Sequence, residues 1–172
     1  MSNIIVTSSS NNFIEQACSN PRLGSKSKSC IQILGSQPNI VSAKNLYDMS
    51  LAIMQSGISS TTNTRAYIEN LLKNLLSKTG PNEKGALQDC KESYDSIILS
   101  FKSALSEVRD DKEYQTATYD LLIASTDTFK PCLDDVVAGK IKDGTILNGN
   151  DLTLIYLLSA YQAVNSIPEE GR

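Results

Sequence analysis

The residues of this chain that could bind a metal or form a covalent cross-link are its four cysteines, Cys18, Cys30, Cys90 and Cys132. Eleven residues lie between the first two, and 41 lie between the last two. Structural zinc sites instead draw their cysteines from closely spaced pairs, so this spacing predicts no metal site. An even number of cysteines is typical of disulfide-bonded proteins from an oxidising compartment, and four cysteines allow three pairings.

The residues needed for catalysis are scarce. The chain contains no histidine, which is the commonest general base and the commonest metal ligand in proteins. Its glycines do not follow the spacing of a phosphate-binding loop. Adjacent acidic residues occur only where we expect turns or helix ends, and solvated carboxylates are common there: Asp110/Asp111, Asp134/Asp135 and Glu169/Glu170. We therefore predict no catalytic residue, no cofactor and no enzymatic activity.

The charge and hydropathy of the chain restrict its partners. The 172 residues carry a formal net charge of −3, whereas nucleic-acid binding requires a basic patch. No apolar run approaches the length of a membrane span, so neither nucleic acid nor a membrane is an expected partner. The first residues, Met1–Val6, lack the basic start and long apolar core of a signal peptide. The oligomeric state is left open.

Two amphipathic stretches determine how the cysteines can meet. Apolar residues recur every three or four positions over Leu87–Val108 and again over Tyr114–Val136, which indicates two α-helices. The short polar segment Arg109–Lys112 between them requires an antiparallel pair. Cys90 lies 20 residues before Asp110 and Cys132 lies 22 residues after it, so both fall at the same level on inward faces. This geometry favours a Cys90–Cys132 disulfide over two free buried thiols.

The remaining sequence predicts an N-terminal hairpin and two further long helices. Residues 1–10 resemble a flexible tail, and residues 11–38 predict two short helices bridged by Cys18–Cys30. We expect residues 39–167 to form a helical bundle and residues 168–172 to form a second tail. The fold class is therefore all-α: an up-down-up-down four-helix bundle preceded by a disulfide-bridged helical hairpin, forming one domain.

Within the predicted bundle, local signals give helix ends and irregularities. Ser42 is the expected cap of a helix that reaches Lys78, with a kink in the small and polar stretch Ser56–Thr64. Pro131 is expected to bend the third helix. The last helix is expected over Leu152–Ile167 after a loop at Ala138–Gly149, with Asn150 or Asp151 as its cap.

The cysteine-containing segments resemble those of the plant invertase and pectin methylesterase inhibitors. Leu87–Tyr94 is similar to the L-x-D-C-x-x-x-Y segment of that family. The segment Cys30–Leu34 with Pro38 resembles its second-cysteine region, and Cys132–Asp134 its fourth. The resemblance extends from Phe13 to Ile167. It implies a secreted helical bundle in the cell wall or apoplast, or in the vacuole, whose protein partner is pectin methylesterase or acid invertase.

The resemblance also implies where such a partner would bind. Glu92 and Asp134 match positions that the esterase inhibitors place in the pectin-binding cleft, and Ser96 occupies a position that is often acidic there. Lys112 lies in the turn where some invertase inhibitors carry a Pro-Lys-Phe motif. We therefore predict binding over the active-site cleft through the outer faces of Leu87–Val108 and Lys112–Val137, by Glu92, Asp95, Ser96, Lys112 and Asp134.

Two other functions remain compatible with the sequence. A bundle of this family could act as a non-inhibitory binding or structural protein, as some pollen allergens do. An enzyme on the same scaffold, using tyrosine or carboxylate acid–base chemistry, is the third alternative.

Overall fold

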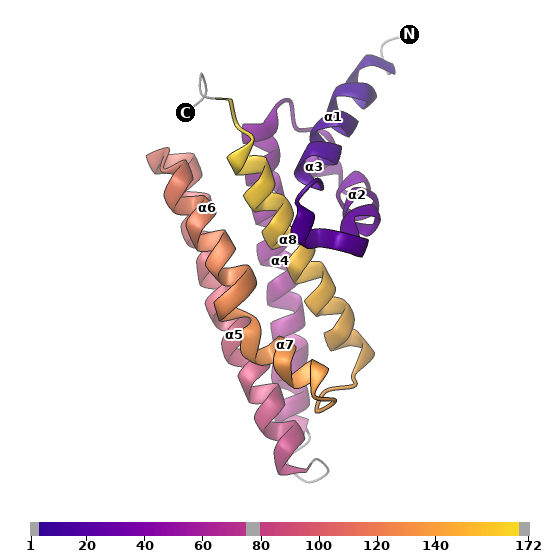
Figure 1. The fold of residues 1–172 in the computed structure, drawn as a ribbon, viewed down its shortest axis with the longest axis vertical. Helices are drawn as coiled ribbons and strands as arrows, with labels where there is room; N and C mark the ends of the chain where they lie inside the picture. Colours follow the sequence, from indigo (N-terminus) through magenta and orange to yellow (C-terminus); the bar gives the residue numbers. More distant parts are fainter. Residues whose placement is uncertain (1–3, 75–79, 169–172) are drawn as a thin grey trace.

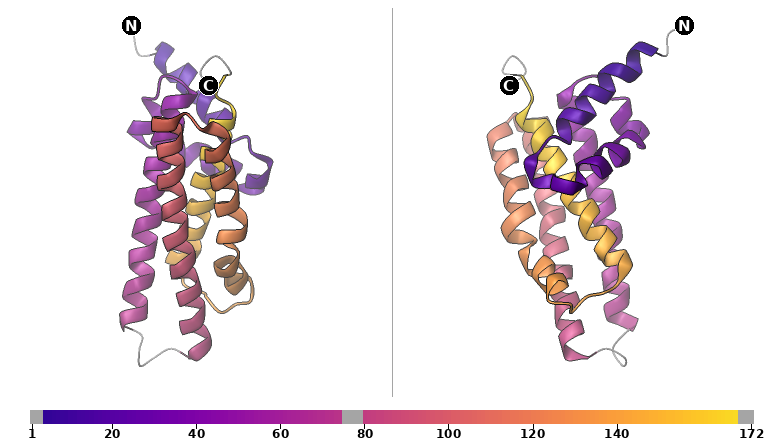
Figure 2. Two further views of the ribbon diagram at one scale, coloured as in Figure 1. Left: turned by 90° about the vertical axis from the view of Figure 1, so that its left-hand side faces the viewer. Right: turned by 45° about the vertical axis from the view of Figure 1, so that its right-hand side comes forward.

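The computed structural model describes residues 4–74 and 80–168, and its regular structure there is entirely helical (Figure 1). Four rod-like units lie side by side, and consecutive units run in alternating directions (Figures 1 and 2). The third rod in the bundle is divided into two helices joined by a short π-helical stretch. The units are α4 (Leu46–Asn74), α5 (Pro81–Ser106), α6 (Tyr114–Ile123) with α7 (Lys130–Val137), and α8 (Gly144–Asn165). The predicted all-α fold is confirmed for the described residues.

The N-terminal segment packs against one side of the bundle near the end where the chain terminates (Figure 2). Cys18 and Cys30 form the predicted disulfide, with their Cα atoms 5.8 Å apart. The expected tail over residues 1–10 extended too far, because α1 already begins at Ile4. A short 3-10 helix lies between Cys18 and Cys30 along the chain. The elements are α1 (Ile4–Ala17), η1 (Pro21–Lys26), α2 (Ser27–Gly35) and α3 (Pro38–Val41).

Two long helices begin at different residues from those predicted. The backbone N–H of Asp48 donates to Asn45 Oδ1 at 2.8 Å, so Asn45, not Ser42, caps α4. Asp143 caps α8 in the same way, because its Oδ1 accepts from the N–H of Ile146 at 3.0 Å. The predicted cap at Asn150 or Asp151 was therefore wrong, and much of the predicted loop 138–149 is helical. The predicted end of α4 at Lys78 lies outside the described residues.

The small and polar middle of α4 is a packing surface. The helix continues through Ser56–Thr64 without interruption, and the expected kink is absent. A Cβ atom added to Gly57 would lie only 2.6 Å from Cζ of Phe101 on α5. The hydroxyl of Thr61 donates to the carbonyl of Gly57 at 2.6 Å, so this buried polar group is satisfied within the helix. Small residues therefore allow α4 and α5 to approach closely.

The predicted bend at Pro131 appears as an interruption of the third unit. A π-helical segment, η3 (Ala124–Thr128), follows α6, and α7 begins at Lys130. Pro131 therefore stands in the first turn of a new helix, where its missing N–H costs no intrahelical hydrogen bond. The change of direction brings α7 across the bundle towards α5 (Figure 1).

The core of the bundle centres on Tyr94 and the second disulfide. Tyr94 packs edge-on against Phe129, with the ring centroids 5.7 Å apart. Its hydroxyl donates to Asn150 Oδ1 at 2.8 Å and accepts from Thr153 Oγ1 at 3.3 Å. Burial raises the pKa of Tyr94, which keeps the hydroxyl protonated as a donor. This pair of hydrogen bonds ties α5 to α8 in the interior of the bundle.

None of the helices in the described ranges combines the length and the apolar character that a membrane span requires.

Candidate functional site

The second disulfide fixes the relative position of two surface helices. Cys90 on α5 and Cys132 on α7 are bonded, their Cα atoms are 4.3 Å apart, and both residues are fully buried. The predicted pairing is therefore confirmed. Its inward position leaves the outer faces of both helices open to solvent while holding them in one arrangement.

A group of charged side chains surrounds this covalent link. Asp135 on α7 is only 6 % exposed, and its Oδ1 accepts from Lys140 Nζ at 2.9 Å. The carboxyl of Asp89 on α5 faces it. Partial burial raises the pKa of Asp89, and the hydrogen bond and negative charge of Asp135 raise it further. Asp135 Oδ2 is buried and accepts no hydrogen bond from a described group. A protonated Asp89 could donate to it.

Neither Asp89 nor Asp135 was among the predicted site residues, although a signal for them existed. Asp89 comes directly before Cys90, and Asp135 follows Cys132 by three residues. Because helices joined by a disulfide and running antiparallel place these positions opposite each other, the predicted pairing already implied their proximity.

Glu92 and Ser96 lie on the outer face of α5. Both are exposed, and they form a row with Leu99 and Ser103 at the spacing of one helix face. Glu92 Oε1 accepts from Gln88 Nε2 at 3.2 Å, and Leu99 is 67 % exposed. We call Glu92, Ser96, Leu99 and Ser103 the α5 row. It presents a carboxylate, hydroxyls and one large apolar side chain along a rigid helix.

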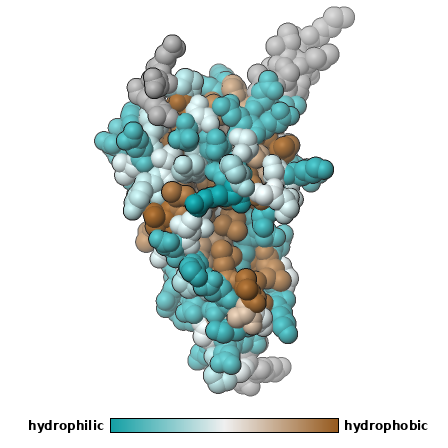
Figure 3. Space-filling view, viewed as in Figure 1, coloured by the Kyte–Doolittle hydropathy of each residue, from teal (hydrophilic) through white to brown (hydrophobic). Residues whose placement is uncertain are grey.

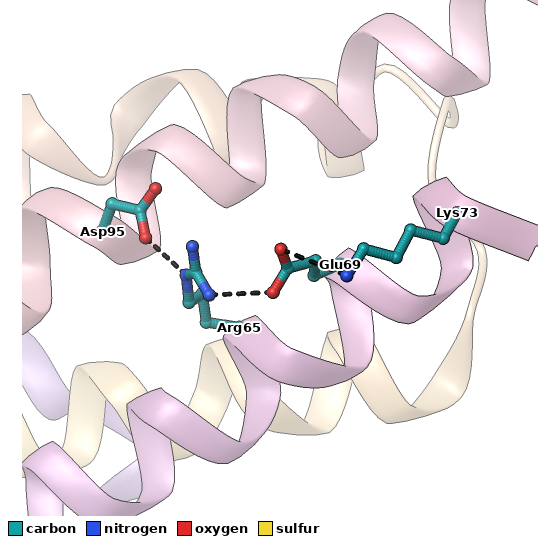
Figure 4. A network of polar contacts seen from close by, with 4 residues as sticks. All are labelled: Arg65, Glu69, Lys73 and Asp95. Atoms are coloured by element: carbon teal, nitrogen blue, oxygen red, sulfur yellow. Dashed lines mark hydrogen bonds and ion pairs between the residues drawn. The ribbon is translucent and has the colours of Figure 1, made fainter.

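Asp95, by contrast, belongs to a network that joins two helices (Figure 4). Its Oδ1 lies 2.5 Å from Nε of Arg65 on α4, and Nη1 of Arg65 lies 2.9 Å from Oε2 of Glu69. Lys73 extends the network to the other oxygen of Glu69, at 3.7 Å. The hydrogen bond to Asp95 is the main cause of a raised pKa at Arg65. Asp95 therefore points towards α4 rather than outwards with the α5 row.

The other two predicted residues lie at opposite ends of the bundle. Asp134 on α7 is exposed, and its Oδ2 lies 2.5 Å from Nζ of Lys130 one turn earlier. Lys112 follows the π-helical end of α5, η2 (Glu107–Asp111), and has a left-handed backbone with φ of 59°. Its Nζ donates to the Tyr47 hydroxyl at 2.7 Å and lies 4.2 Å from the centre of that ring. This hydrogen bond raises the pKa of Lys112, which keeps it charged.

The structure thus divides the five predicted residues. Glu92 and Ser96 share one exposed face, Asp134 stands on the helix that the disulfide holds beside it, Asp95 faces α4, and Lys112 is distant at the α5–α6 turn (Figure 1). Within the described part of the chain, no three or more histidine, cysteine or acidic side chains are grouped as metal ligands would be. The exposed faces of α5 and α7 are thus held side by side by a buried disulfide.

Comparison with known proteins gives one family and several similar solved structures, two of which are pectin methylesterase inhibitors. Residues 12–157 match the plant invertase/pectin methylesterase inhibitor family. A mutant form of a pectin methylesterase inhibitor from Arabidopsis superposes with a TM-score of 0.74 at 18 % identity, covering 89 % of this chain and 97 % of that one. A pectin methylesterase inhibitor from Arabidopsis thaliana gives 0.67 at 16 % identity, with 98 % and 99 % coverage. No curated protein sequence matches the chain.

Proposed function

Because the chain belongs to the plant invertase/pectin methylesterase inhibitor family, we propose that it inhibits pectin methylesterase or acid invertase by covering the active-site cleft. Members of this family are inhibitors rather than enzymes. The observation that carries the proposal is the exposed α5 row beside a disulfide that fixes α5 against α7. Asp134 on α7 would extend the contact, as the sequence predicted.

The rigidity of this surface favours tight binding. Helices that keep their relative position lose little conformational freedom when a partner binds, and this lowers the cost of association. Within the α5 row, Glu92, Ser96 and Ser103 can replace the hydroxyl groups of a carbohydrate as hydrogen-bonding partners in a cleft. Leu99 adds a large apolar side chain near the middle of the row, where burial contributes most to an interface.

The same reasoning supports an extracellular role. Both cysteine pairs are oxidised, and structural disulfides persist in secreted proteins. We propose that the protein is secreted to the plant cell wall or apoplast, where its target enzyme would be its partner.

The test is a pair of inhibition assays on the purified protein, one with pectin methylesterase and one with acid invertase. For whichever enzyme is inhibited, we expect Glu92→Ala and Asp134→Ala each to weaken inhibition by about fivefold or more. Glu15→Ala is the matched control, because Glu15 is an exposed carboxylate on α1, away from the proposed surface. All three variants should keep the melting temperature of the parent, since the changed side chains are exposed.

Lys112 provides a way to distinguish the two targets. A requirement for Lys112 in invertase inhibition, but not in esterase inhibition, would agree with its position in the turn. Full inhibition by both the Glu92 and Asp134 variants would contradict the proposed surface. Absence of inhibition in both assays would instead favour the non-inhibitory binding protein.

A further inference from the structure

A second pocket lies on the hairpin side of the molecule, away from the α5 row. A different cavity, of about 460 Å³, lies at the α5–α6 turn, and its lining includes Asn45 and the predicted site residue Lys112. The pocket on the hairpin side has a volume of about 400 Å³, and its lining residues come from the start of η1, from α6 and from α8. Pockets that hold small molecules have similar volumes. Its lining residues are Asn20, Pro21, Arg22, Leu122, Tyr161, Gln162 and Asn165.

The smaller of these two cavities, which we call the Arg22 pocket, is distinct from the 460 Å³ cavity at the α5–α6 turn. Its most distinctive group is the guanidinium of Arg22. Among the arginines that the structure describes, Arg65 and Arg109 form ion pairs with Asp95 and Asp110, but Arg22 has no carboxylate partner in the described ranges. None of the residues that line the pocket is acidic. A positive site is thus open in a chain of net charge −3.

The loop that carries Arg22 is held in one conformation. Asn20 is 6 % exposed, and its Oδ1 accepts from the backbone N–H of Arg22 at 2.9 Å. Gly24 has φ of 52° and ψ of −123°, a backbone conformation that side chains disfavour. The hydroxyl of Ser27 donates to the carbonyl of Cys18 at 2.9 Å, and Cys18 is bonded to Cys30. The disulfide and these hydrogen bonds therefore fix the backbone from which Arg22 projects.

The other walls of the Arg22 pocket combine amides with apolar surface. Asn20, Gln162 and Asn165 supply amide groups, which can both donate to and accept from hydroxyl groups. The ring of Tyr161 and the side chain of Leu122 supply apolar surface. The Tyr161 hydroxyl makes no hydrogen bond to any residue that the structure describes. A ligand for this pocket would thus carry a carboxylate, several hydroxyls and a flat apolar face.

We propose that the Arg22 pocket binds an acidic oligosaccharide built of uronic acid residues, with one carboxylate held by the Arg22 guanidinium. A guanidinium matches the two oxygens of a carboxylate, and such charge-assisted hydrogen bonds are among the strongest in proteins. The amides match the ring hydroxyls, and the C–H face of a pyranose packs on the tyrosine ring. A simple anion would use only the arginine and leave the remaining walls without a role. This inference concerns a different face from the proposed inhibitory surface and does not depend on it.

The experiment is an isothermal titration of the full chain with trigalacturonic acid, supported by thermal-shift measurements. We expect saturable binding that Arg22→Ala weakens by about tenfold or more, because it removes the charge-assisted contact. Lys28→Ala is the control: Lys28 is an exposed cation on α2 outside the pocket, and its loss changes the net charge equally. Binding by this variant should stay within about twofold of the parent. Arg22 is exposed, so both variants should retain the helical circular dichroism of the parent.

Two further ligands separate the sources of binding. Maltotriose offers hydroxyls without a carboxylate, and citrate offers carboxylates without sugar rings; we expect both to bind at least about tenfold more weakly than the acidic trisaccharide. Citrate that binds as tightly as the trisaccharide would reduce the pocket to a simple anion site and overturn the proposal. Equal binding by the Arg22→Ala variant, or no binding of the trisaccharide at millimolar concentration, would also overturn it.

Discussion

Replacement of Gly57 by alanine tests how closely α4 and α5 must approach. Ordinary contacts between carbon atoms lie at about 3.5–4.0 Å. A Cβ on residue 57 would instead lie 2.6 Å from Cζ and 2.7 Å from Cε1 of Phe101, whose side chain is fully buried. Because the ring has no space to move into, the two helices must separate or the ring must leave its preferred rotamer.

The expected magnitude follows from two opposing terms. Alanine stabilises a helix interior by about 1 kcal/mol relative to glycine. Overpacking a filled core costs about 1–3 kcal/mol, and the rigid neighbour at Gly57 favours the upper end. We therefore expect Gly57→Ala to lower the free energy of unfolding by about 2 kcal/mol, equivalent to about 4–8 °C in melting temperature for a chain of this size.

Gly85→Ala is the matched control for this change. Gly85 also lies within a helix, α5, but a Cβ there would meet nothing within 4 Å. The same substitution should therefore stabilise the protein by about 1 kcal/mol. The assay is equilibrium denaturation in guanidinium chloride, followed by circular dichroism with both disulfides intact. Equal stabilities for the Gly57 and Gly85 variants would refute the packing argument. A Phe101→Leu background, which shortens the facing side chain, should reduce the penalty at position 57.

Two further predictions concern the surroundings of the second disulfide. Replacing Cys90 and Cys132 together by alanine should lower the free energy of unfolding by about 4 kcal/mol, and replacing Cys18 and Cys30 by about 3 kcal/mol. The first loss is larger because the Cys90–Cys132 disulfide closes a longer loop, with a sequence separation of 42 instead of 12. Denaturation of both double variants measures the difference, and the reverse order would contradict the entropic account. The raised pKa of Asp89 means that folding favours its protonated form, so its stabilising contribution is complete below about pH 4 and is lost as the pH rises through the raised pKa. The Asp89→Asn variant cannot ionise at this position, so its stability relative to the parent should increase as the pH rises above about 4, with no such advantage in acid. Denaturation of both proteins at several pH values measures this difference. A difference in stability that does not change with pH would exclude the linkage.

The sequence alone determined the class of fold and both covalent links. Apolar spacing along Leu87–Val108 and Tyr114–Val136 is a local property, so it indicated the helices directly. The short turn at Arg109–Lys112 then placed Cys90 opposite Cys132 by counting residues. The segments around Cys30, Cys90 and Cys132, with the spacing of the four cysteines, also indicated the family. These features could be predicted because each depends on neighbours in the chain or on a single tight turn.

The tertiary structure alone decided which polar side chains belong to the same surface. Asn45 and Asp143 cap α4 and α8, although Ser42, Asn150 and Asp151 are equally plausible caps in sequence. Asp95 binds Arg65, which lies 30 residues away, and so faces α4 instead of solvent. The Arg22 pocket combines residues from η1, α6 and α8, and no local pattern brings these together. Helix periodicity fixes which residues face inwards, but the neighbours of each polar side chain depend on how the helices pack.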